Sequence, residues 1–244
     1  MILKMKDFPK INFTYWLLMI LATTIGEIVG NLISRNFELG YSSGSILLIS
    51  IYIIALTAIT LKKGESHIFY WLLIILGNIA GTNIADFIVI SPLNLGTIWG
   101  SLLVMGILTT ILLVWQLIAP NSSIDKGLDL KTQFLYWFAI LMSSTFGTTS
   151  GDFLSNDTPL GALGGSLLLL VLLAIVVFLV FYTKISKELC YWIALVLMHP
   201  IGATIGNYIS KPEGLNFGNV WTSVVLLILF VSIYLTSKPT ISKY

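Results

Sequence analysis

The sequence predicts an all-α integral membrane protein with eight transmembrane helices. Mean hydropathy is +0.95, 57% of the residues are hydrophobic and only 10% are charged, a composition that excludes a water-soluble globular protein. Apolar stretches long enough to cross the hydrocarbon core, roughly 20 residues each, recur along the whole chain. The segments between them are too short to form a soluble domain. The predicted spans are residues 11–32, 43–61, 68–89, 97–118, 134–154, 160–182, 189–209 and 217–236.

The distribution of basic residues predicts the orientation in the membrane. Eight spans place both termini on one side, and that side receives all of the 13 basic residues except Arg35 and Lys211. Because cytoplasmic loops carry the excess of lysine and arginine, both termini are expected to be cytoplasmic. The net charge of +2 arises from these lysines and does not indicate nucleic-acid binding. The residues on the terminal side are Lys4, Lys6, Lys10, Lys62, Lys63, Lys126, Lys131, Lys184, Lys187, Lys238 and Lys243.

Four tryptophans mark an internal repeat. Their spacings are 55, 66 and 55 residues, so the chain is a single membrane domain (1–244) made of two similar halves (1–120 and 121–244). Each unit holds two spans, so all four units lie the same way up, and an axis along the membrane normal is expected to relate them. We interpret the tryptophans as anchors at the membrane interface. They are Trp16, Trp71, Trp137 and Trp192, and the four helical hairpins cover approximately residues 11–65, 66–120, 132–186 and 187–240.

A ladder of polar side chains follows each tryptophan. The residues 7, 11 and 15 positions later are separated by steps of four, so each trio lies on one face of its helix. Eleven of these twelve positions are polar, which makes the ladder the best candidate for a functional site in so apolar a chain. The trios are Thr23, Glu27 and Asn31; Asn78, Thr82 and Asp86; Ser144, Thr148 and Asp152; and His199, Ala203 and Asn207.

Small residues form a second ladder, one position before the polar one. Their small-xxx-small spacing lets helix backbones approach closely in lipid, where no hydrophobic force drives helices together. The odd-numbered spans are therefore expected to pack around the centre with their polar faces turned inward. The predicted packing residues are Gly26, Gly30, Gly81, Gly147, Gly151, Gly202 and Gly206, with Ala85 in the remaining place.

The glycine blocks that follow the tryptophans resemble those of a known family. Residues 26–31 read GEIVGN, residues 147–152 read GTTSGD and residues 199–207 read HPIGATIGN. They are similar to a bacterial membrane-protein family built from four tandem copies of a repeat of unknown function, each with two transmembrane segments and a tryptophan. The resemblance implies a location in the bacterial inner membrane and supplies no substrate. In that family the block tends to end in aspartate, whereas this chain has Asn31 and Asn207.

The acidic residues of the ladder lie at depths where a charge is costly. With the tryptophans at the inner interface, Glu27 lies about 16 Å further in, near the midplane, and Asp86 and Asp152 lie about 22 Å in. A central acidic side chain costs about 3 kcal/mol on insertion scales, and no lysine or arginine lies inside a predicted span. These carboxyl groups are expected to be protonated, to face a hydrated cavity or to bind a cation.

Purely structural interpretations stay open for the residues of the polar ladder other than Glu27. We call the residues at equivalent positions in the four trios a rung. Serine and threonine hydroxyls often only hydrogen-bond between membrane helices. Asp86 and Asp152 have solvation at the outer mouth as their alternative, and Asn31 and Asn207 have helix termination.

A histidine and a proline lie together in the seventh predicted span. Pro200 cannot donate a hydrogen bond to the carbonyl of Val196, so a kink is expected there. A freed carbonyl beside the His199 imidazole suits a cation or a proton. A histidine that only packs in the interior is the alternative.

The polar ladder favours a transporter or channel-like carrier for a small cation, either a proton or a divalent metal such as Mn²⁺ or Zn²⁺. The alternative is a membrane scaffold or sensor that transports nothing. No HExxH motif or Walker loop is present, so no enzymatic activity is expected. The expected partners are the lipid bilayer and the cation, with no cofactor beyond a bound metal ion; no pattern specifies an oligomeric state. The predicted ion-binding residues are Glu27, Asp86, Asp152, His199, Asn78, Thr148, Thr82, Asn31 and Asn207, of which the first four are the predicted metal ligands.

Overall fold

The described part of the chain is helical almost throughout. The computed structural model describes residues 9–36, 40–61, 67–118 and 128–241. Its α-helices coincide within a few residues with the eight predicted spans, which confirms the all-helical prediction. They are α1 (Phe13–Asn31), α2 (Tyr41–Leu61), α3 (His67–Val89), α4 (Gly96–Ile118), α5 (Leu130–Asn156), α6 (Gly161–Tyr182), α7 (Lys187–Ser210) and α8 (Asn219–Ile241).

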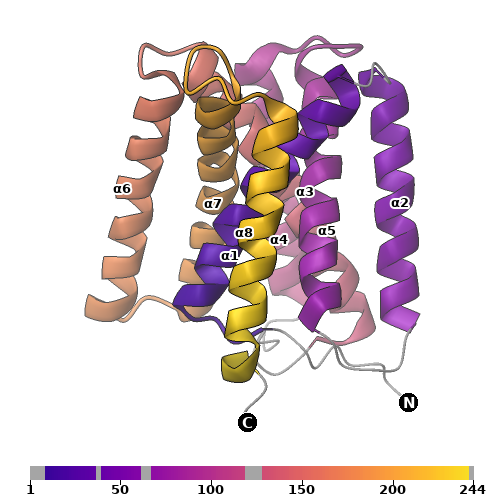
Figure 1. Cartoon of the computed structure of the whole chain (residues 1–244). Helices are drawn as coiled ribbons and strands as arrows, with labels where there is room; N and C mark the ends of the chain where they lie inside the picture. The colour runs from indigo at the N-terminus through magenta and orange to yellow at the C-terminus, as the bar shows by residue number, and fades with distance from the viewer. Residues whose placement is uncertain (1–8, 37–39, 62–66, 119–127, 242–244) are drawn as a thin grey trace.

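Several of the basic residues that predict the orientation lie outside the described part of the chain. The start of α1 and the end of α8 lie at the same end of the bundle (Figure 1). The positions outside are Lys4, Lys6, Lys62, Lys63, Lys126 and Lys243, together with the side chains of Arg35 and Lys238.

Local signals set the ends of α1. The side chain of Asn12 accepts a hydrogen bond of 2.9 Å from the backbone N–H of Tyr15, which satisfies one of the free donors of the first turn. At its other end α1 continues into a short π-helical segment, η1 (Leu32–Asn36). Asn31 is therefore the last α-helical residue of α1 but does not end the helical path of the chain.

Seven of the eight helices are long and apolar enough to cross a membrane, and α5 is the exception. Its 27 residues, about 40 Å of helix, are long enough. Its hydropathy is lowered by a run of hydroxyl side chains in the middle of the helix. The transmembrane placement of α5 therefore stays a prediction. The hydroxyl residues are Ser143, Ser144, Thr145, Thr148, Thr149 and Ser150.

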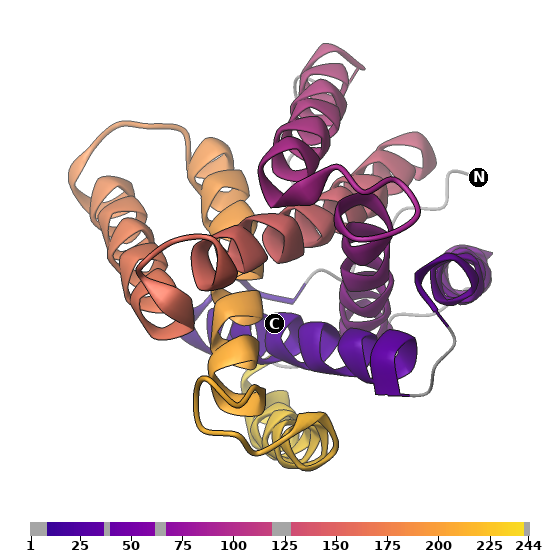
Figure 2. The ribbon, with the colours of Figure 1, turned by 90° about the horizontal axis from the view of Figure 1, so that it is seen from above.

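The odd-numbered helices form a closed ring. Each of α1, α3, α5 and α7 packs against two others, in the cyclic order α1–α3–α5–α7–α1. Seen from above, these four helices cross at the sides of a square, and the even-numbered helices stand outside it (Figure 2). All residues of the polar ladder therefore belong to the inner ring.

The outer helices pack across the boundaries between the repeat units. Each one packs mainly on the inner helix of the next unit: α2 on α3, α4 on α5, α6 on α7, and α8 back on α1. Small residues near the start of the outer helices allow this; a Cβ atom added at Gly44 would lie 2.8 Å from Oδ1 of Asn83. Each unit is therefore closed by the outer helix of the unit before it.

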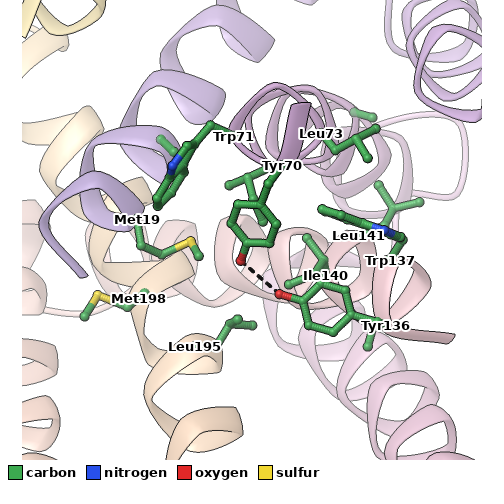
Figure 3. Close-up of a cluster of buried hydrophobic side chains, with 14 of the residues drawn as sticks. Met19, Tyr70, Trp71, Leu73, Tyr136, Trp137, Ile140, Leu141, Leu195 and Met198 are labelled. Carbon is green, nitrogen blue, oxygen red and sulfur yellow. Dashed lines mark hydrogen bonds between the residues drawn. The ribbon is translucent and has the colours of Figure 1, made fainter. Parts of the chain in front are cut away.

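The repeat tryptophans lie inside the protein, so their interpretation as interfacial anchors is wrong for at least three of them. Trp71 and Trp137 are 2% and 1% exposed, Trp192 is also buried and Trp16 is half-buried. Each indole packs edge-on against the tyrosine that precedes it, with ring centroids 5.1 to 5.7 Å apart. Figure 3 shows Trp71 and Trp137 among the buried side chains of the inner ring.

Candidate functional site

The inner helices approach one another most closely at the glycine ladder. A Cβ atom added at Gly26 would lie 2.1 Å from the Cβ atom of Asn78, a separation that real side chains do not reach. The first glycine of each unit lies in this way against the first polar residue of the next inner helix. The polar ladder therefore lies where neighbouring helices meet. The close pairs are Gly26 with Asn78, Gly81 with Ser144, Gly147 with His199 and Gly202 with Thr23; one turn later come Gly30 with Thr82, Gly151 with Ala203 and Gly206 with Glu27.

The first rung of the ladder bonds mostly to backbone carbonyls. The hydroxyl of Thr23 donates to the carbonyl of Met198 at 3.3 Å, and that of Ser144 donates to the carbonyl of Asn78 at 3.3 Å. The amide of Asn78 donates to the carbonyl of Ile74 in its own helix. Two of these bonds join different helices, as the structural interpretation of these residues expects.

His199 lies apart from the acidic residues. Its Nδ1 is 2.9 Å from the hydroxyl of Ser143 and 2.8 Å from the carbonyl of Leu195. α7 remains helical through Pro200. In the part of the chain that the structure describes, no three His, Cys, Asp or Glu side chains gather as metal ligands do. The four predicted metal ligands are therefore not brought together in this conformation.

Glu27 lies at the centre of the second rung and is 2% exposed. Its Oε2 accepts hydrogen bonds from the hydroxyls of Thr148 at 2.8 Å and Thr82 at 3.3 Å, and these two hydroxyls are 3.2 Å apart. Its Oε1 accepts a bond of 2.8 Å from the amide of Asn31. Ala203 fills the fourth place. Three inner helices thus place neutral hydrogen-bonding groups around one buried carboxyl group.

The third rung holds two further carboxyl groups. Oδ1 of Asp152 accepts from the amides of Asn207 at 2.9 Å and Asn156 at 3.4 Å, and the ammonium group of Lys211 lies 3.7 Å away. Asp86 is buried within α3 and is not solvated at a mouth. Asp86 and Asp152 both lie close enough to Glu27 for their charges to interact with it. No lysine or arginine lies inside a predicted span, but Lys211, just beyond the seventh one, reaches Asp152.

A ring of four tyrosines closes one end of the axis, and sequence reasoning missed it. Each hydroxyl is hydrogen-bonded to two others, with O–O distances of 2.7, 3.0, 2.9 and 3.0 Å around the ring. A ring with these edges puts each oxygen about 2 Å from the centre, less than the roughly 2.7 Å that a water oxygen needs. No water fits through it. The signal was available, because a tyrosine precedes every repeat tryptophan: Tyr15, Tyr70, Tyr136 and Tyr191.

An apolar collar lies between the tyrosine ring and the polar ladder. Its four side chains follow the tyrosines by four residues, one helical turn, and all are fully buried. Figure 3 shows part of the collar beside the hydrogen bond between Tyr70 and Tyr136. Along the axis from this end, the tyrosine ring comes first, the apolar collar second and the three rungs of the polar ladder last. The collar consists of Met19, Ile74, Ile140 and Leu195.

The ladder also continues by one rung at its other end. Lys211 follows Asn207 by four residues, and Asn156 follows Asp152 by four, so the same spacing predicts both contacts with the third rung. Arg35 takes the corresponding position in the first unit, and its side chain lies outside the described part of the chain.

Comparison with known proteins finds a family similarity in the second half of the chain. Residues 135–186 and 190–238 match a family described as Repeat of Unknown Function (DUF347). The second half is thus similar to two DUF347 repeats. Their limits agree with the third and fourth predicted units, 132–186 and 187–240. No curated protein and no solved structure matches the chain. The DUF347 repeats thus support a multi-pass membrane protein and name no activity.

Proposed function

We propose that this chain is a membrane carrier that moves a small cation along the axis of the α1–α3–α5–α7 ring. The four units are related by a pseudo-fourfold axis along the membrane normal, and the acidic residues face this axis. Glu27 is the central binding group, with Asp86 and Asp152 toward the outer end.

One observation carries the proposal: the carboxyl group of Glu27 is buried where three inner helices meet, and the groups that donate to it are neutral. A buried carboxylate is stable when it is paired with a cation or protonated. Asp86 and Asp152 add negative charge within its reach. Such a site attracts positive ions and releases them when the charge balance changes.

The two ends of the axis differ in a way that suits alternating access. The tyrosine ring and the apolar collar close the end near the chain termini. At the other end Lys211, whose side chain is 26% exposed, reaches Asp152. We propose that the present conformation is closed at the tyrosine end.

Replacing Glu27 with glutamine tests the carrier. Glu27→Gln keeps the shape and removes the charge, so cation or proton flux into proteoliposomes is expected to fall to the level of empty liposomes, while expression and thermal stability stay close to wild type. Glu213→Gln is the matched control, because that carboxyl group is exposed in the loop after α7 and should leave flux unchanged. Wild-type flux from the Glu27→Gln protein would refute the proposal.

We also propose that the protein lies in the bacterial inner membrane with both termini in the cytoplasm. The excess of lysines on the terminal side supports this orientation. A C-terminal fusion to a reporter that is active only in the cytoplasm is expected to be active, and a fusion to a reporter active only in the periplasm is expected to be inactive. The reverse pattern would invert the axis and place the tyrosine ring outside.

A second candidate, a scaffold that transports nothing, is favoured by a different observation. Much of the first rung is bonded to backbone or to neighbouring helices, as a packing element would be. On this alternative no flux is measured from wild-type protein, and Glu27→Gln lowers only the thermal stability. The same liposome experiment therefore separates the two candidates.

A further inference from the structure

Two buried amide oxygens lie beside the acidic groups of the axis without a hydrogen-bond partner. They are Oδ1 of Asn31 and Oδ1 of Asn207, on side chains that are 3% and 2% exposed. A buried acceptor without a donor is costly, and nearly all such groups in proteins are satisfied. These two oxygens therefore indicate a ligand that supplies positive charge or a donor.

The amide orientations follow from the donors on the same side chains. Nδ2 of Asn31 donates to Glu27 and Nδ2 of Asn207 donates to Asp152. Because a carboxylate only accepts, each amide must direct its nitrogen to the acid, which fixes where its oxygen lies. Each acid thus has an amide group bonded to it whose oxygen has no partner.

The position of the neighbouring glycine brings the two pairs close. A Cβ atom added at Gly206, next to Asn207, would lie 3.3 Å from Cγ of Glu27. Thr148, which bonds to Glu27, precedes Asp152 by one turn of α5. Carboxyl and amide oxygens from α1, α5 and α7 therefore meet in the outer half of the ring.

We propose that these four groups, Glu27, Asn31, Asp152 and Asn207, bind a hard divalent cation of the Mg²⁺, Ca²⁺ or Mn²⁺ class. The inference rests on the proposed carrier function and names its substrate class. An amide oxygen does not take up a proton under physiological conditions, so the two unpartnered oxygens favour a metal ion over a proton. Oxygen ligands favour hard cations, whereas Zn²⁺ commonly uses nitrogen or sulfur. In the described part of the chain His199 is not gathered with the acidic residues as a metal ligand would be.

Lys211 acts in this site as a built-in competitor. If Glu27, Asp86 and Asp152 are all ionised, they carry three negative charges, and the ammonium group 3.7 Å from Asp152 balances one of them. The remaining charge suits a divalent ion. An arriving cation displaces the ammonium group from Asp152, and Lys211 is partly exposed and able to withdraw.

Cation binding to the purified full chain in detergent tests the site. The probes are Mn²⁺, Ca²⁺ and Mg²⁺, with Na⁺ at equal ionic strength as reference, and the readout is the midpoint of thermal unfolding. A divalent ion is expected to raise the midpoint in a saturable manner. Lys211→Met is expected to tighten the apparent Kd by about tenfold, because it removes the competing charge. Lys184→Met, at an exposed lysine after α6, is the matched control and should leave the Kd unchanged.

Changes at the amides separate this site from binding elsewhere. Asn207→Leu removes the amide oxygen and is expected to weaken binding at least about tenfold. Asn207→Asp keeps an oxygen at this position and should bind at least as tightly as wild type. If neither wild type nor Lys211→Met responds to any divalent ion, or if Asn31→Leu and Asn207→Leu leave the Kd unchanged, the site is refuted. Binding without flux would refute the carrier and leave the site standing. Flux that depends on Glu27 without any divalent binding would refute the divalent site and leave the carrier standing.

Discussion

Gly26→Ala is expected to destabilise the inner ring by at least about 3 kcal/mol, because it overpacks a contact with no room for a methyl group. The added Cβ atom would lie 2.1 Å from Cβ of Asn78 and 2.9 Å from its backbone carbonyl carbon. Backbone cannot rotate aside as a side chain can, so α1 and α3 must separate along their length. For a chain of this size the thermal unfolding midpoint in detergent should fall by roughly 10 °C.

Gly106→Ala provides a matched control within the same protein. Gly106 lies in α4, and nothing lies within 4 Å of the position where its Cβ would stand. This substitution is expected to leave the midpoint unchanged or raise it slightly, since alanine favours helix over glycine. Equal midpoints for the two variants would mean that α1 and α3 do not pack in the observed manner.

The inner ring was largely predictable from sequence because two spacings act together. Steps of four place Glu27, Thr82 and Thr148 on single helix faces, and glycines one position earlier place those faces at the closest contacts. Lipid offers polar groups no partners, so the faces can only turn toward one another. The hydrogen bonds from Thr82 and Thr148 to Glu27 follow from this arrangement.

The pairing of outer with inner helices was not predictable in the same way. An outer helix such as α6 is apolar on nearly all sides, so its sequence specifies no face and no partner. The outer helix α2, for example, packs on α3, where Gly44 meets Asn83. Contacts of this kind depend on shape at one or two positions, and a hydropathy pattern does not record them.

The tyrosine ring and Lys211, which sequence reasoning missed, lie just beyond the two ends of the polar ladder. Tyrosine and tryptophan at a helix end fit both an interface and an interior, because each joins an apolar ring to one polar group. Only the fourfold recurrence of tyrosine before tryptophan distinguishes the two. Lys211 was counted as a loop residue, although it continues the spacing of Asn207. A long lysine side chain reaches back along its helix, so a basic group outside a span can still neutralise an acid inside it.

Ile140→Ser is expected to make the closed end leak. Ile140 belongs to the apolar collar, is fully buried and lies one turn from Tyr136 in α5. An apolar constriction blocks ions because water does not remain in it, and a hydroxyl there lets water stay. The tyrosine hydroxyls exclude water but can pass a proton from one to the next, so if the collar barrier falls by about 1.4 kcal/mol, the passive flux of protons into liposomes rises about tenfold. Ile175→Ser is the matched control, since Ile175 is exposed on the lipid-facing side of α6.

Tyr70→Phe separates the two layers of this closure. It removes two of the four hydrogen bonds of the tyrosine ring and leaves the collar intact. The hydroxyls of Tyr15 and Tyr136 each lose a ring partner, so the thermal midpoint is expected to fall, while leakage rises less than in Ile140→Ser. Tyr182→Phe, at an exposed tyrosine, should change neither quantity. If the collar variant stays as tight as wild type and the ring variant alone leaks, the hydroxyl ring is the barrier, and the collar serves only to pack the helices behind it.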